Sequence, residues 1–471
     1  MPRVIKTRAL AIVSIIGLIG VRCAALGADL PPWLSWSGGL ATDEGFYTLD
    51  ARHQVLFGAM ARGNFHDRLL SPLLSIMQQG VFHVFGPSLI TARAICVLLG
   101  LLTIALLWLG LRVSFGMGAA NAGALLLGFA PPFVLYNRLA LQETPAVFWL
   151  AVSFALWAVA HQNKARGLLF WAGAAAGLAF LCKGLAFVFV PALCWAAWRG
   201  GRRGWALAGG LGAVLLGYAA LWYVPHHAEL ARMGAYYQTH QFAPHSADSL
   251  WLNIRRAGVG DRAGVLRGIA PYLLLFMPVP CLLAISRLRS FAQKTPAEQV
   301  LWVWLAGGVL FCCVSSYAPD RYYVLFLPPL CGLAGIALAA LAPVPRRVFG
   351  LAASLLSVLW LGAAWQGRTW TARDNARTLA HLLPARSVVV GDMAPAVCLG
   401  TTLDAAPVQP GLSNDARPVE ILGADYLAVT RAPVYTRWWQ ARCPLLVQPA
   451  RRVASLHVGT RWIVDVYKVK P

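Results

Sequence analysis

Charged side chains are scarce in this sequence. They make up 12% of the 471 residues, whereas soluble domains average about 25%. Acids are the scarcest, because 18 Asp and Glu stand against 40 Lys and Arg, a formal net charge of +22. A chain of several soluble domains is therefore excluded, although the length alone would suggest one. The basic residues fall in short clusters between apolar runs, which is typical of membrane topology and not of nucleic-acid binding.

Metal-binding cysteine spacings are absent as well. Cys312 and Cys313 are adjacent, and most other cysteines lie in or beside apolar runs, where a cysteine behaves as a small hydrophobe. Cys398 and Cys443 lie outside these runs, in a region that we expect in an oxidising compartment, so they are candidates for a disulfide. The sequence predicts no metal site and no required cofactor, and it leaves a dependence on a divalent metal open.

The chain is instead rich in long apolar runs. A helix needs about 20 apolar residues to cross a bilayer, and the sequence predicts eleven transmembrane helices. The expected crossings are 9–28, 89–111, 117–135, 145–160, 168–182, 184–198, 205–223, 268–286, 299–316, 322–342 and 348–365. The fifth and sixth share one apolar run, so they are either two crossings or one bent crossing plus a partial one.

The charge pattern predicts the topology. With the N-terminus in the cytoplasm, the inner segments carry fourteen cations: Arg3, Lys6, Arg8, Arg112, Lys164, Arg166, Arg199, Arg202, Arg203, Arg287, Arg289, Lys294, Arg346 and Arg347. This agrees with the positive-inside rule at each cytoplasmic loop. An odd number of crossings then places the C-terminal region outside, in the periplasm if the cell is Gram-negative. The first segment could instead be a cleaved signal peptide; we favour a retained helix, and cleavage would leave the remaining topology unchanged.

Three regions are expected outside. Two are loops, at about 29–88 and 224–266, and the first of these contains an amphipathic stretch, 69–85, that we predict to lie on the membrane surface. The third, 366–471, alternates short β-like runs with Pro- and Gly-rich turns, and the runs are Ser387–Gly391, Tyr426–Thr430 and Trp462–Val469. It is predicted to be a small α/β domain.

Charged residues beside membrane segments are costly and are candidates for function. Asp43 and Glu44 are adjacent acids about 15 residues after the first crossing, where one carboxyl group could act as a general base. A solvated pair of loop acids is the alternative. Arg138 and Glu143 lie in a short connection between the third and fourth crossings, and the alternative there is a mutual surface ion pair.

Two further cations belong to the same predicted face. Lys183 lies at the outward end of the fifth crossing, where it must snorkel, pair with an acid or bind an anion. Arg321, with Tyr322, opens the tenth crossing and offers a guanidinium suited to phosphate; an aromatic belt with a neutralised Asp320–Arg321 pair is the alternative. Acids, cations and tyrosines on one face suggest a phosphate-bearing substrate embedded in the membrane.

The order of these motifs resembles the GT-C superfamily of membrane glycosyltransferases. It is most similar to the branch of the protein O-mannosyltransferases and the lipid A aminoarabinose transferases. The resemblance covers about residues 10–345 and is carried by motifs in this order: Asp43-Glu44 with Tyr47, Gly63-Asn64-Phe65, Phe85-Gly86, Ala92-Arg93, Arg138 to Glu143, Cys182-Lys183-Gly184, and Arg321-Tyr322 before Pro328-Pro329.

The resemblance implies a fold and a reaction. Residues 1–365 would form the transmembrane glycosyltransferase domain, a multi-pass protein of the plasma membrane. Its donor would be a polyprenyl-phosphate-linked sugar, and its acceptor a hydroxyl or phosphate group of lipid A, a cell-envelope glycan or a protein. Asp43 would be the general base, helped by Glu44 and Tyr47, and Glu143 would shape the site. Lys183 and Arg321 would bind the leaving phosphate, with Arg138 and Tyr322 beside them.

One departure leaves the acceptor open. Aminoarabinose transferases carry a Lys-Pro pair at the start of the amphipathic helix, whereas this sequence has Ser71-Pro72. His66 or Arg68 could replace that lysine. A transporter or flippase of lipid-linked precursors is the main alternative, but it would favour charges near the bilayer midplane and symmetric halves, which the sequence lacks. A non-catalytic assembly protein is a second alternative.

Overall fold

The computed structural model describes residues 2–31, 42–236, 272–288, 291–314, 319–410, 413–414 and 416–470. The chain divides into two compact units. Unit 1 comprises Met1–Leu26, Cys96–Leu221 and His245–Ala363, and unit 2 comprises Gly27–Ile95, Trp222–Pro244 and Ala364–Pro471. Unit 2 thus combines the first long loop of the sequence analysis with the C-terminal region. Most of the second predicted loop, 237–266, lies outside the described residues.

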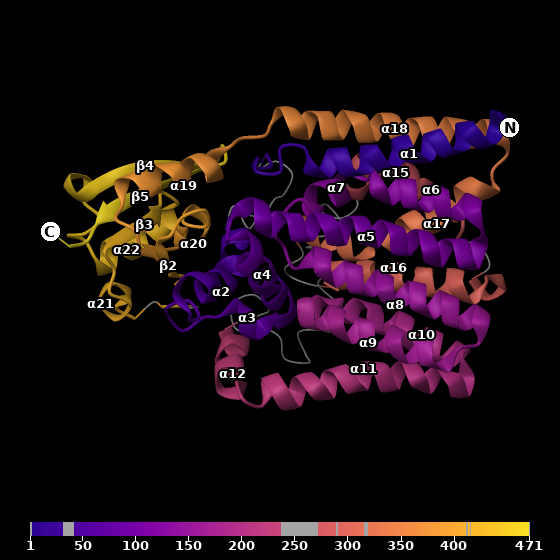
Figure 1. The fold of residues 1–471 in the computed structure, drawn as a ribbon, viewed down its shortest axis with the longest axis horizontal. Coiled ribbons are helices and arrows are strands. Elements are labelled where there is room, and N and C mark those ends of the chain that lie inside the picture. Colours follow the sequence, from indigo (N-terminus) through magenta and orange to yellow (C-terminus); the bar gives the residue numbers. More distant parts are fainter. Residues whose placement is uncertain are drawn as a thin grey trace, which may run out of the picture. The chain divides into compact units, whose positions relative to one another are not determined.

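Unit 1 is a bundle of helices that run alongside one another (Figure 1). The helices that form it wholly or in part are α1 Pro2–Cys23, α5 Leu89–Phe115, α6 Met117–Gly128, α7 Pro131–Asn137, α8 Glu143–Asn163, α9 Arg166–Cys182, η3 Gly184–Phe189, α10 Val190–Arg199, η4 Gly201–Gly204, α11 Trp205–Tyr218, η5 Ala219–Tyr223, α15 Pro278–Ile285, η7 Phe291–Gln293, α16 Pro296–Val314, η8 Asp320–Phe326, α17 Leu327–Ala340 and α18 Pro343–Gln366. The predicted class, an α-helical protein with several apolar helices, is confirmed.

The described helices alone do not confirm the eleven predicted crossings. Five described helical segments are long and apolar enough to cross a membrane: Leu89–Phe115, Glu143–Asn163, Gly201–Tyr223, Asp320–Ala340 and Pro343–Gln366. The pair α6 and α7 would make a sixth, and four shorter apolar helices are Ile12–Cys23, Arg166–Cys182, Gly184–Arg199 and Pro296–Cys312. Each predicted crossing coincides with one of these segments or, for 268–286, with α15. Length and composition alone therefore support five or six spans among the described helices and do not confirm eleven.

Prolines break one predicted crossing into two helices. The expected span 117–135 ends as α6 at Gly128 and restarts as α7 at Pro131, with a bend of 61° between them. Pro131 and Pro132 occupy the first positions of α7, where the missing N–H would have no intrahelical partner in any case. The prolines thus fix where α7 begins, and α7 delivers the chain into the short connection before α8.

Glycines allow α9 and α11 to pack closely. A Cβ atom at Gly173 would lie 1.9 Å from the carbonyl oxygen of Leu207, and one at Gly210 would lie 1.8 Å from the carbonyl oxygen of Phe170. Helices in lipid associate through such close backbone packing, since the surrounding chains are as apolar as the side chains. Any larger residue at Gly173 or Gly210 would force α9 and α11 apart.

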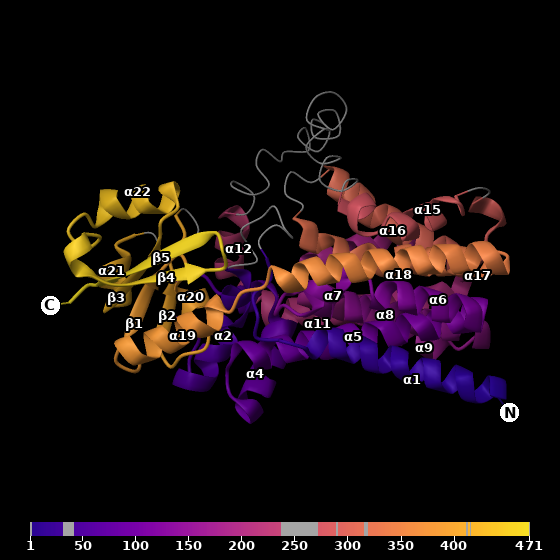
Figure 2. The ribbon, with the colours of Figure 1, turned by 90° about the horizontal axis from the view of Figure 1, so that it is seen from above.

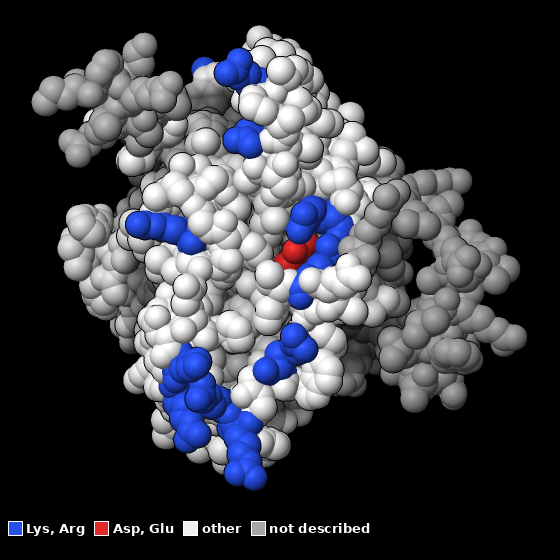
Figure 3. Space-filling model, turned by 90° about the vertical axis from the view of Figure 1, so that its right-hand side faces the viewer, with Lys and Arg blue, Asp and Glu red and all other residues white. Residues whose placement is uncertain are grey.

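Basic side chains gather at one end of unit 1. Figure 3 shows this end, with several groups of Lys and Arg and few acids. The cations near the helix ends and in the connections between them are Arg112, Lys164, Arg166, Arg199, Arg202, Arg203, Arg287, Lys294, Arg346 and Arg347. Glu298 lies among them, because its carboxylate pairs with Arg287 at 2.9 Å and with Lys294 at 3.0 Å.

Unit 2 combines short helices with a five-stranded sheet. Its elements are α2 Asp43–Phe57, α3 Asp67–Leu70, α4 Pro72–Phe85, α12 His227–Tyr236, α19 Thr371–Leu382, β1 Val388–Gly391, α20 Ala394–Val397, β2 Asp404–Pro407, α21 Pro418–Leu422, β3 Tyr426–Thr430, α22 Pro433–Arg442, η9 Pro449–Arg451, β4 Arg452–Val458 and β5 Trp462–Lys468. The predicted amphipathic stretch is helical, as α4, and begins at Pro72 with the favoured proline in its first turn.

The sheet has the strand order β2-β1-β3-β5-β4. β1 is parallel to β2 and β3, whereas β5 is antiparallel to β3 and β4. Figure 2 shows α19 and α20 on one side of the strands and α22 on the other. Two apolar clusters fill these faces, since Val389 points into one and Val388 and Val390 into the other. The three predicted β-like runs are confirmed as β1, β3 and β5.

The predicted disulfide is wrong. Cys398 and Cys443 are both free. Cys398 is buried in the cluster that contains Val389, and Cys443 packs against the cluster on the opposite face of the sheet. Burial raises the pKa of the Cys398 thiol to about 12, so this thiol stays protonated at neutral pH.

One carboxyl group makes the stability of the sheet depend on pH. Asp392 follows β1 and accepts hydrogen bonds from the hydroxyl of Thr430 and, at 3.2 Å, from its N–H. Burial raises the pKa of Asp392 from 3.8 to about 6. A group that binds its proton more tightly in the folded state contributes stability that is fully present below about pH 4 and is lost as the pH rises through about 6.

We therefore expect Asp392→Asn to be more stable than the wild type at pH 8, by up to about 3 kcal/mol. The advantage should shrink toward pH 4.5, where the wild-type carboxyl group is itself neutral. Urea unfolding followed by tryptophan fluorescence at both pH values measures the difference. An equal effect of the substitution at the two pH values would contradict this prediction.

Candidate functional site

Three charged side chains of unit 1 meet at the start of α8. The carboxylate of Glu143, the first residue of α8, lies 2.8 Å from the ammonium nitrogen of Lys183 and 3.3 Å from Nε of Arg321. All three are buried, with Glu143 fully enclosed and 8% of Lys183 exposed. Three residues that the sequence analysis selected separately thus form one ion-pair cluster, the Glu143–Lys183–Arg321 trio.

Local sequence places each member of the trio. Glu143 occupies the first turn of α8, where the helix dipole favours an acid. Lys183 directly follows α9 and has an extended backbone, with φ −159° and ψ 123°. Pro319 starts η8 in an extended conformation, so that Arg321 lies in the first turn. Three different breaks between helices therefore point these side chains to one place.

One aromatic ring contacts both cations. Nζ of Lys183 is 5.0 Å from the ring centroid of Tyr322, and Cζ of Arg321 is 5.5 Å from it. Such cation–π contacts hold both groups without neutralising them. Two cations and one carboxylate leave a formal charge of +1, and the half-buried Tyr322 adds a hydroxyl group. The trio is therefore suited to a single anionic group such as a phosphodiester.

The trio lies at the end of unit 1 away from the basic connections. Glu143 begins α8, whereas Lys164 caps its other end 21 residues later, which is a distance of about 30 Å. Lys183 is likewise separated from Arg166 by the whole of α9. Thirty ångströms is about the thickness of the hydrocarbon core of a bilayer. The two ends of α8 can thus reach opposite membrane surfaces.

Arg138 makes other contacts. Its guanidinium donates hydrogen bonds to the carbonyl oxygens of Ala25 at 2.7 Å and Val21 at 3.3 Å. Glu143 pairs with Lys183 and Arg321 instead. These two contacts replace the mutual ion pair between Arg138 and Glu143 that the sequence left as an alternative. Arg138 anchors the connection before α8 to the end of α1.

Asp43 and Tyr47 belong to unit 2. Asp43 is the first residue of α2, and its side chain is half-buried. Tyr47, four residues later, lies on the same face of the helix and is also half-buried. An acid that is neither fully solvated nor fully enclosed at a helix N-terminus is suited to proton transfer with a bound substrate.

Glu44 is bound on both oxygens. Arg93 donates to its carboxylate at 2.8 and 2.6 Å and to the carbonyl oxygen of Ala28 at 2.7 Å. Both partners are almost completely buried. A bidentate pair of this kind fixes the start of α2, where Asp43 also lies.

Removing Arg93 would leave the Glu44 carboxylate buried without its partner. We expect Arg93→Ala to lower the free energy of unfolding by about 3–5 kcal/mol. The double variant Arg93→Met/Glu44→Leu, which has neither charge, should recover most of this loss. Urea unfolding in detergent micelles compares the two, and a double variant as unstable as Arg93→Ala would contradict the account.

His66 and Arg68 surround Asp50, which the sequence analysis did not select. Nδ1 of His66 is 3.0 Å from a carboxylate oxygen of Asp50, and the N–H groups of Ala61 and Arg68 donate to Asp50 at 3.2 Å. Burial acts to lower the pKa of His66, but the hydrogen bond to Asp50 and the negative charges of Asp50 and Glu229 together outweigh burial and raise the pKa. The guanidinium of Arg68 bonds to Gln79 at 2.7 Å. Both side chains thus order the turn before α4.

The sequence motifs contain Arg93 without giving it a role, and they do not include Asp50. The signal for Arg93 was present, since a lone arginine at the start of an apolar helix is costly unless it is paired. Asp50 gave no comparable signal, because an acid in the middle of a polar helix is usually solvated.

Metal-ligating groups do not cluster in the part of the chain that the structure describes. The predicted outer loop 224–266 contains four histidines, His226, His227, His240 and His245. Nδ1 of His226 is 3.8 Å from Glu229, and His227 contacts the carbonyl oxygen of Val224. His240 and His245 lie outside the described residues.

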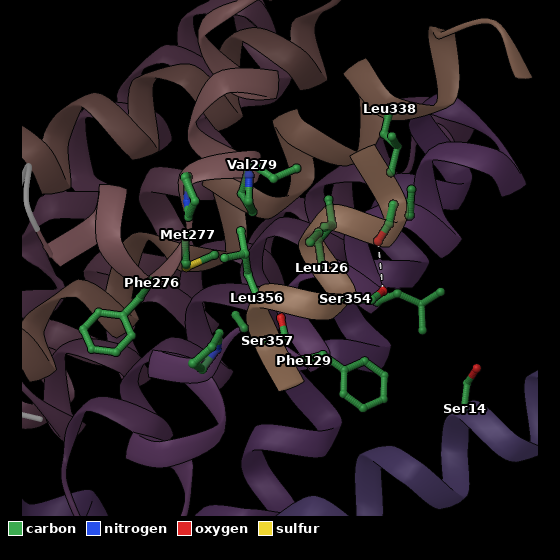
Figure 4. A pocket seen from close by; sticks show the side chains of 18 residues that line it. Ser14, Leu126, Phe129, Phe276, Met277, Val279, Leu338, Ser354, Leu356 and Ser357 are labelled. Carbon is green, nitrogen blue, oxygen red and sulfur yellow. Dashed lines mark hydrogen bonds between the residues drawn. The ribbon is translucent and has the colours of Figure 1, made fainter. Parts of the chain in front are cut away.

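Unit 1 also contains a cavity of about 300 Å³ (Figure 4). It is lined by apolar residues from α1, α6, α7, α15, α17 and α18, such as Phe129 and Leu338, with three serines. The hydroxyl of Ser354 donates to the carbonyl oxygen of Gly350 at 2.9 Å. None of the lining residues is ionisable, and none belongs to the trio. This cavity is therefore not suited to proton transfer or to binding phosphate.

Comparisons with known proteins agree with this arrangement. Residues 70–226 match the family model of the dolichyl-phosphate-mannose-protein mannosyltransferases. A comparison with curated protein sequences gave no match. The structure is similar to the crystal structure of ArnT from Cupriavidus metallidurans bound to undecaprenyl phosphate, with a TM-score of 0.65 and 15% identity over 97% of this chain and 98% of that one.

Two further structures are similar over most of the chain. ArnT from the same organism in the apo state gives a TM-score of 0.63 and 16% identity, covering 98% of both chains. The archaeal oligosaccharyltransferase AglB from Archaeoglobus fulgidus, in complex with an inhibitory peptide and a dolichol-phosphate, gives a TM-score of 0.52 and 14% identity, covering 90% of this chain and 69% of that one. The predicted resemblance to GT-C glycosyltransferases is confirmed. Because the sequence identities to the solved structures are low, this similarity establishes the fold alone.

Proposed function

We propose that this chain is an inverting glycosyltransferase that transfers a sugar from a polyprenyl-phosphate donor to a hydroxyl or phosphate acceptor. The observation that carries the proposal is the convergence of Lys183 and Arg321 on Glu143, with the ring of Tyr322 in contact with both cations. This cluster belongs to a chain that shares its fold, over nearly its whole length, with ArnT bound to undecaprenyl phosphate. A positively charged cluster at the end of apolar helices suits a phosphate that carries a lipid tail.

The trio would stabilise the leaving group. A polyprenyl-phosphate sugar carries one negative charge on its phosphodiester, which the formal charge of +1 on the trio balances. When the bond to the sugar breaks, negative charge builds up on the departing phosphate, and cations already in place stabilise it without reorganising. Glu143 keeps the two cations oriented and prevents them from repelling each other.

Asp43 would activate the acceptor. Inversion requires one carboxylate that takes the proton from the acceptor hydroxyl as that oxygen attacks the anomeric carbon. Asp43 is the candidate, because Glu44 is already bound by Arg93. For a phosphate acceptor, which is already ionised, Asp43 would orient the attacking oxygen.

The membrane arrangement is part of the proposal. We place the N-terminus and the basic connections in the cytoplasm, and the trio and the C-terminal sheet outside, with eleven crossings of the plasma membrane. The cations at one end of unit 1 (Figure 3) support this orientation through the positive-inside rule. The alternative, a transporter of lipid-linked precursors, would also hold cations on one surface. It is not favoured, because the matching family model describes mannosyltransferases and a similar solved structure is an oligosaccharyltransferase.

A transfer assay separates the two functions. The full-length protein in lipid nanodiscs is given undecaprenyl-phosphate-linked mannose or aminoarabinose, radiolabelled in the sugar, together with lipid A, a Ser/Thr-rich peptide or an envelope glycan extract. The proposal expects label to move to one acceptor class, with Asp43→Asn as the blank. If no donor and acceptor pair reacts, while proteoliposomes of the same protein move the labelled donor between leaflets, the transporter is the correct function.

A further inference from the structure

α2 is built into the hydrophobic core of the C-terminal sheet. Leu49 lies in α2, and Ala61 lies after the end of α2; both are about 95% buried. They belong to the same apolar cluster as Val389 of β1, Ala394 of α20 and Val464 of β5. In Figure 1, α2 lies next to α20 and β2. The helix that begins with Asp43 is thus a structural element of the C-terminal fold, although more than 300 residues separate them in sequence.

The first contact is at Gly45, directly after Asp43 and Glu44. A Cβ atom at Gly45 would lie 2.5 Å from the backbone nitrogen of Ala396 and 2.6 Å from its Cα atom. Because these are backbone atoms of α20, they cannot move aside as a side chain would. The first turn of α2 is therefore seated against the backbone of the C-terminal domain, and only glycine fits there.

The second contact is made by two arginines. Nη2 of Arg52 donates to the carbonyl oxygens of Thr401 at 2.8 Å and Leu403 at 2.5 Å, with 1% of the residue exposed. Nε of Arg62 is 2.6 Å from a carboxylate oxygen of Asp404, the first residue of β2. Hydrogen bonds from a charged donor are about twice as strong as neutral ones. The contacts of Arg52 and Arg62 therefore fix how α2 is rotated about its axis and where it lies along β2.

The third contact is a reciprocal pair of asparagines. The N–H of Asn64 donates to the side chain of Asn414, and the N–H of Asn414 donates to the side chain of Asn64, both at 2.9 Å. Gly63 next to it has φ +111°, and a Cβ atom there would collide with Asn414. The Gly63-Asn64 motif of the sequence analysis is thus a docking point for the C-terminal domain.

We infer that the C-terminal sheet is a positioning platform for α2, and that Gly45, Arg52 and Arg62 are positioning residues for the Asp43 carboxylate. The inference rests on the proposed function, in which Asp43 is the base. A helix of 15 residues is marginal in isolation, so α2 needs a partner to hold its first turn. A displacement of about 1 Å at a reacting group can lower the rate about 100-fold.

The test compares two arginines that differ in what they hold. Arg62 is 52% exposed and pairs with the buried Asp404, linking the segment that follows α2 to β2. Arg431 is 48% exposed and pairs with the buried Asp465 within the sheet itself. Arg62→Ala and Arg431→Ala each leave a buried carboxylate without this partner, but only the first removes a link to α2.

Hydrogen exchange of the full-length protein in nanodiscs gives a readout that needs no substrate. We expect Arg62→Ala to speed exchange of the amides of α2, residues 43–57, by about tenfold, and Arg431→Ala to leave it unchanged. Gly45→Ala should give the same result as Arg62→Ala, with Gly234→Ala as its control, since nothing lies within 4 Å of a Cβ atom at Gly234. Equal exchange of α2 in Arg62→Ala and Arg431→Ala would overturn the inference.

Transfer activity supplies the second readout. Arg62→Ala should lower kcat about tenfold or more and leave the KM for the donor within about twofold, since the trio is untouched. Arg431→Ala should keep the wild-type kcat. If α2 exchanges faster in Arg62→Ala while kcat is unchanged, the sheet does not position the base. If Asp43→Asn itself is active, the assignment of Asp43 as the base fails, and the exchange data still decide whether α2 depends on the sheet. If no donor and acceptor pair reacts with the wild type, the proposed function fails.

Discussion

Asp43→Asn should lower turnover by about 10²- to 10⁴-fold, the range that general base catalysis contributes. The substitution preserves the volume and the hydrogen-bonding shape of the side chain but removes its ability to accept a proton. Asp43 starts a helix that Glu44 and Arg93 anchor through two short hydrogen bonds, so folding should not change. The measurement is kcat in the transfer assay, together with binding of undecaprenyl phosphate, which should stay at the wild-type level.

Glu44→Gln is the informative companion. It retains one acceptor oxygen for Arg93 and leaves Asp43 intact, so we expect a milder loss of turnover and a measurable loss of stability. Wild-type turnover in Asp43→Asn would remove Asp43 from the mechanism. A larger loss of turnover in Glu44→Gln than in Asp43→Asn, at equal protein stability, would instead assign the proton transfer to Glu44.

Arg321→Ala should lower kcat/KM for the donor by about 10²- to 10³-fold, which is the cost of removing one preorganised charge from a transition state. The fold should survive, because Glu143 keeps its contact with Lys183 at 2.8 Å. Arg321→Lys should also be impaired, since an ammonium group cannot reproduce the planar guanidinium. The KM for the acceptor should change little in either variant.

A second trio in the same unit provides the matched control. Glu298 pairs with Arg287 at 2.9 Å and with Lys294 at 3.0 Å, at the end of unit 1 with the basic connections. Arg287→Ala also removes one of two cations from a buried carboxylate, but we propose no phosphate there. Similar losses of kcat/KM in Arg287→Ala and Arg321→Ala would show that the effect is structural and that Arg321 does not bind the donor.

The sequence predicted the helices and three strands well, because long apolar runs and short runs such as Val388–Gly391 are strong local signals. It missed β2 and β4. β2 reads Asp-Ala-Ala-Pro, a composition that is poor in strand formers, and forms only because β1 offers it a parallel edge. β4 is mostly exposed and is held by pairing with β5. The disulfide prediction failed for a related reason, since nothing in the sequence states which face of a sheet a cysteine will occupy.

The candidate site was predicted as residues but not as contacts. Glu143, Lys183 and Arg321 were found because a charge beside an apolar run is costly and needs a reason. Their mutual pairing depends on three helix breaks that are far apart in the sequence, so local patterns could not predict it. The same holds for Arg93, whose partner Glu44 lies 49 residues earlier, and for the docking of Gly45 onto Ala396.

The packing of α2 into the hydrophobic core of the C-terminal sheet also constrains the order in which the chain can fold. Arg52 leaves the ribosome 349 residues before Thr401, to which it donates a hydrogen bond. At synthesis rates of about 5–20 residues per second, α2 waits roughly 20–70 s for the sheet that holds it. During that interval Leu49 and the buried arginine have no core to enter, so this segment is where a translocating chain would first need a chaperone. A ribosome that stops before the last strand leaves α2 without its core.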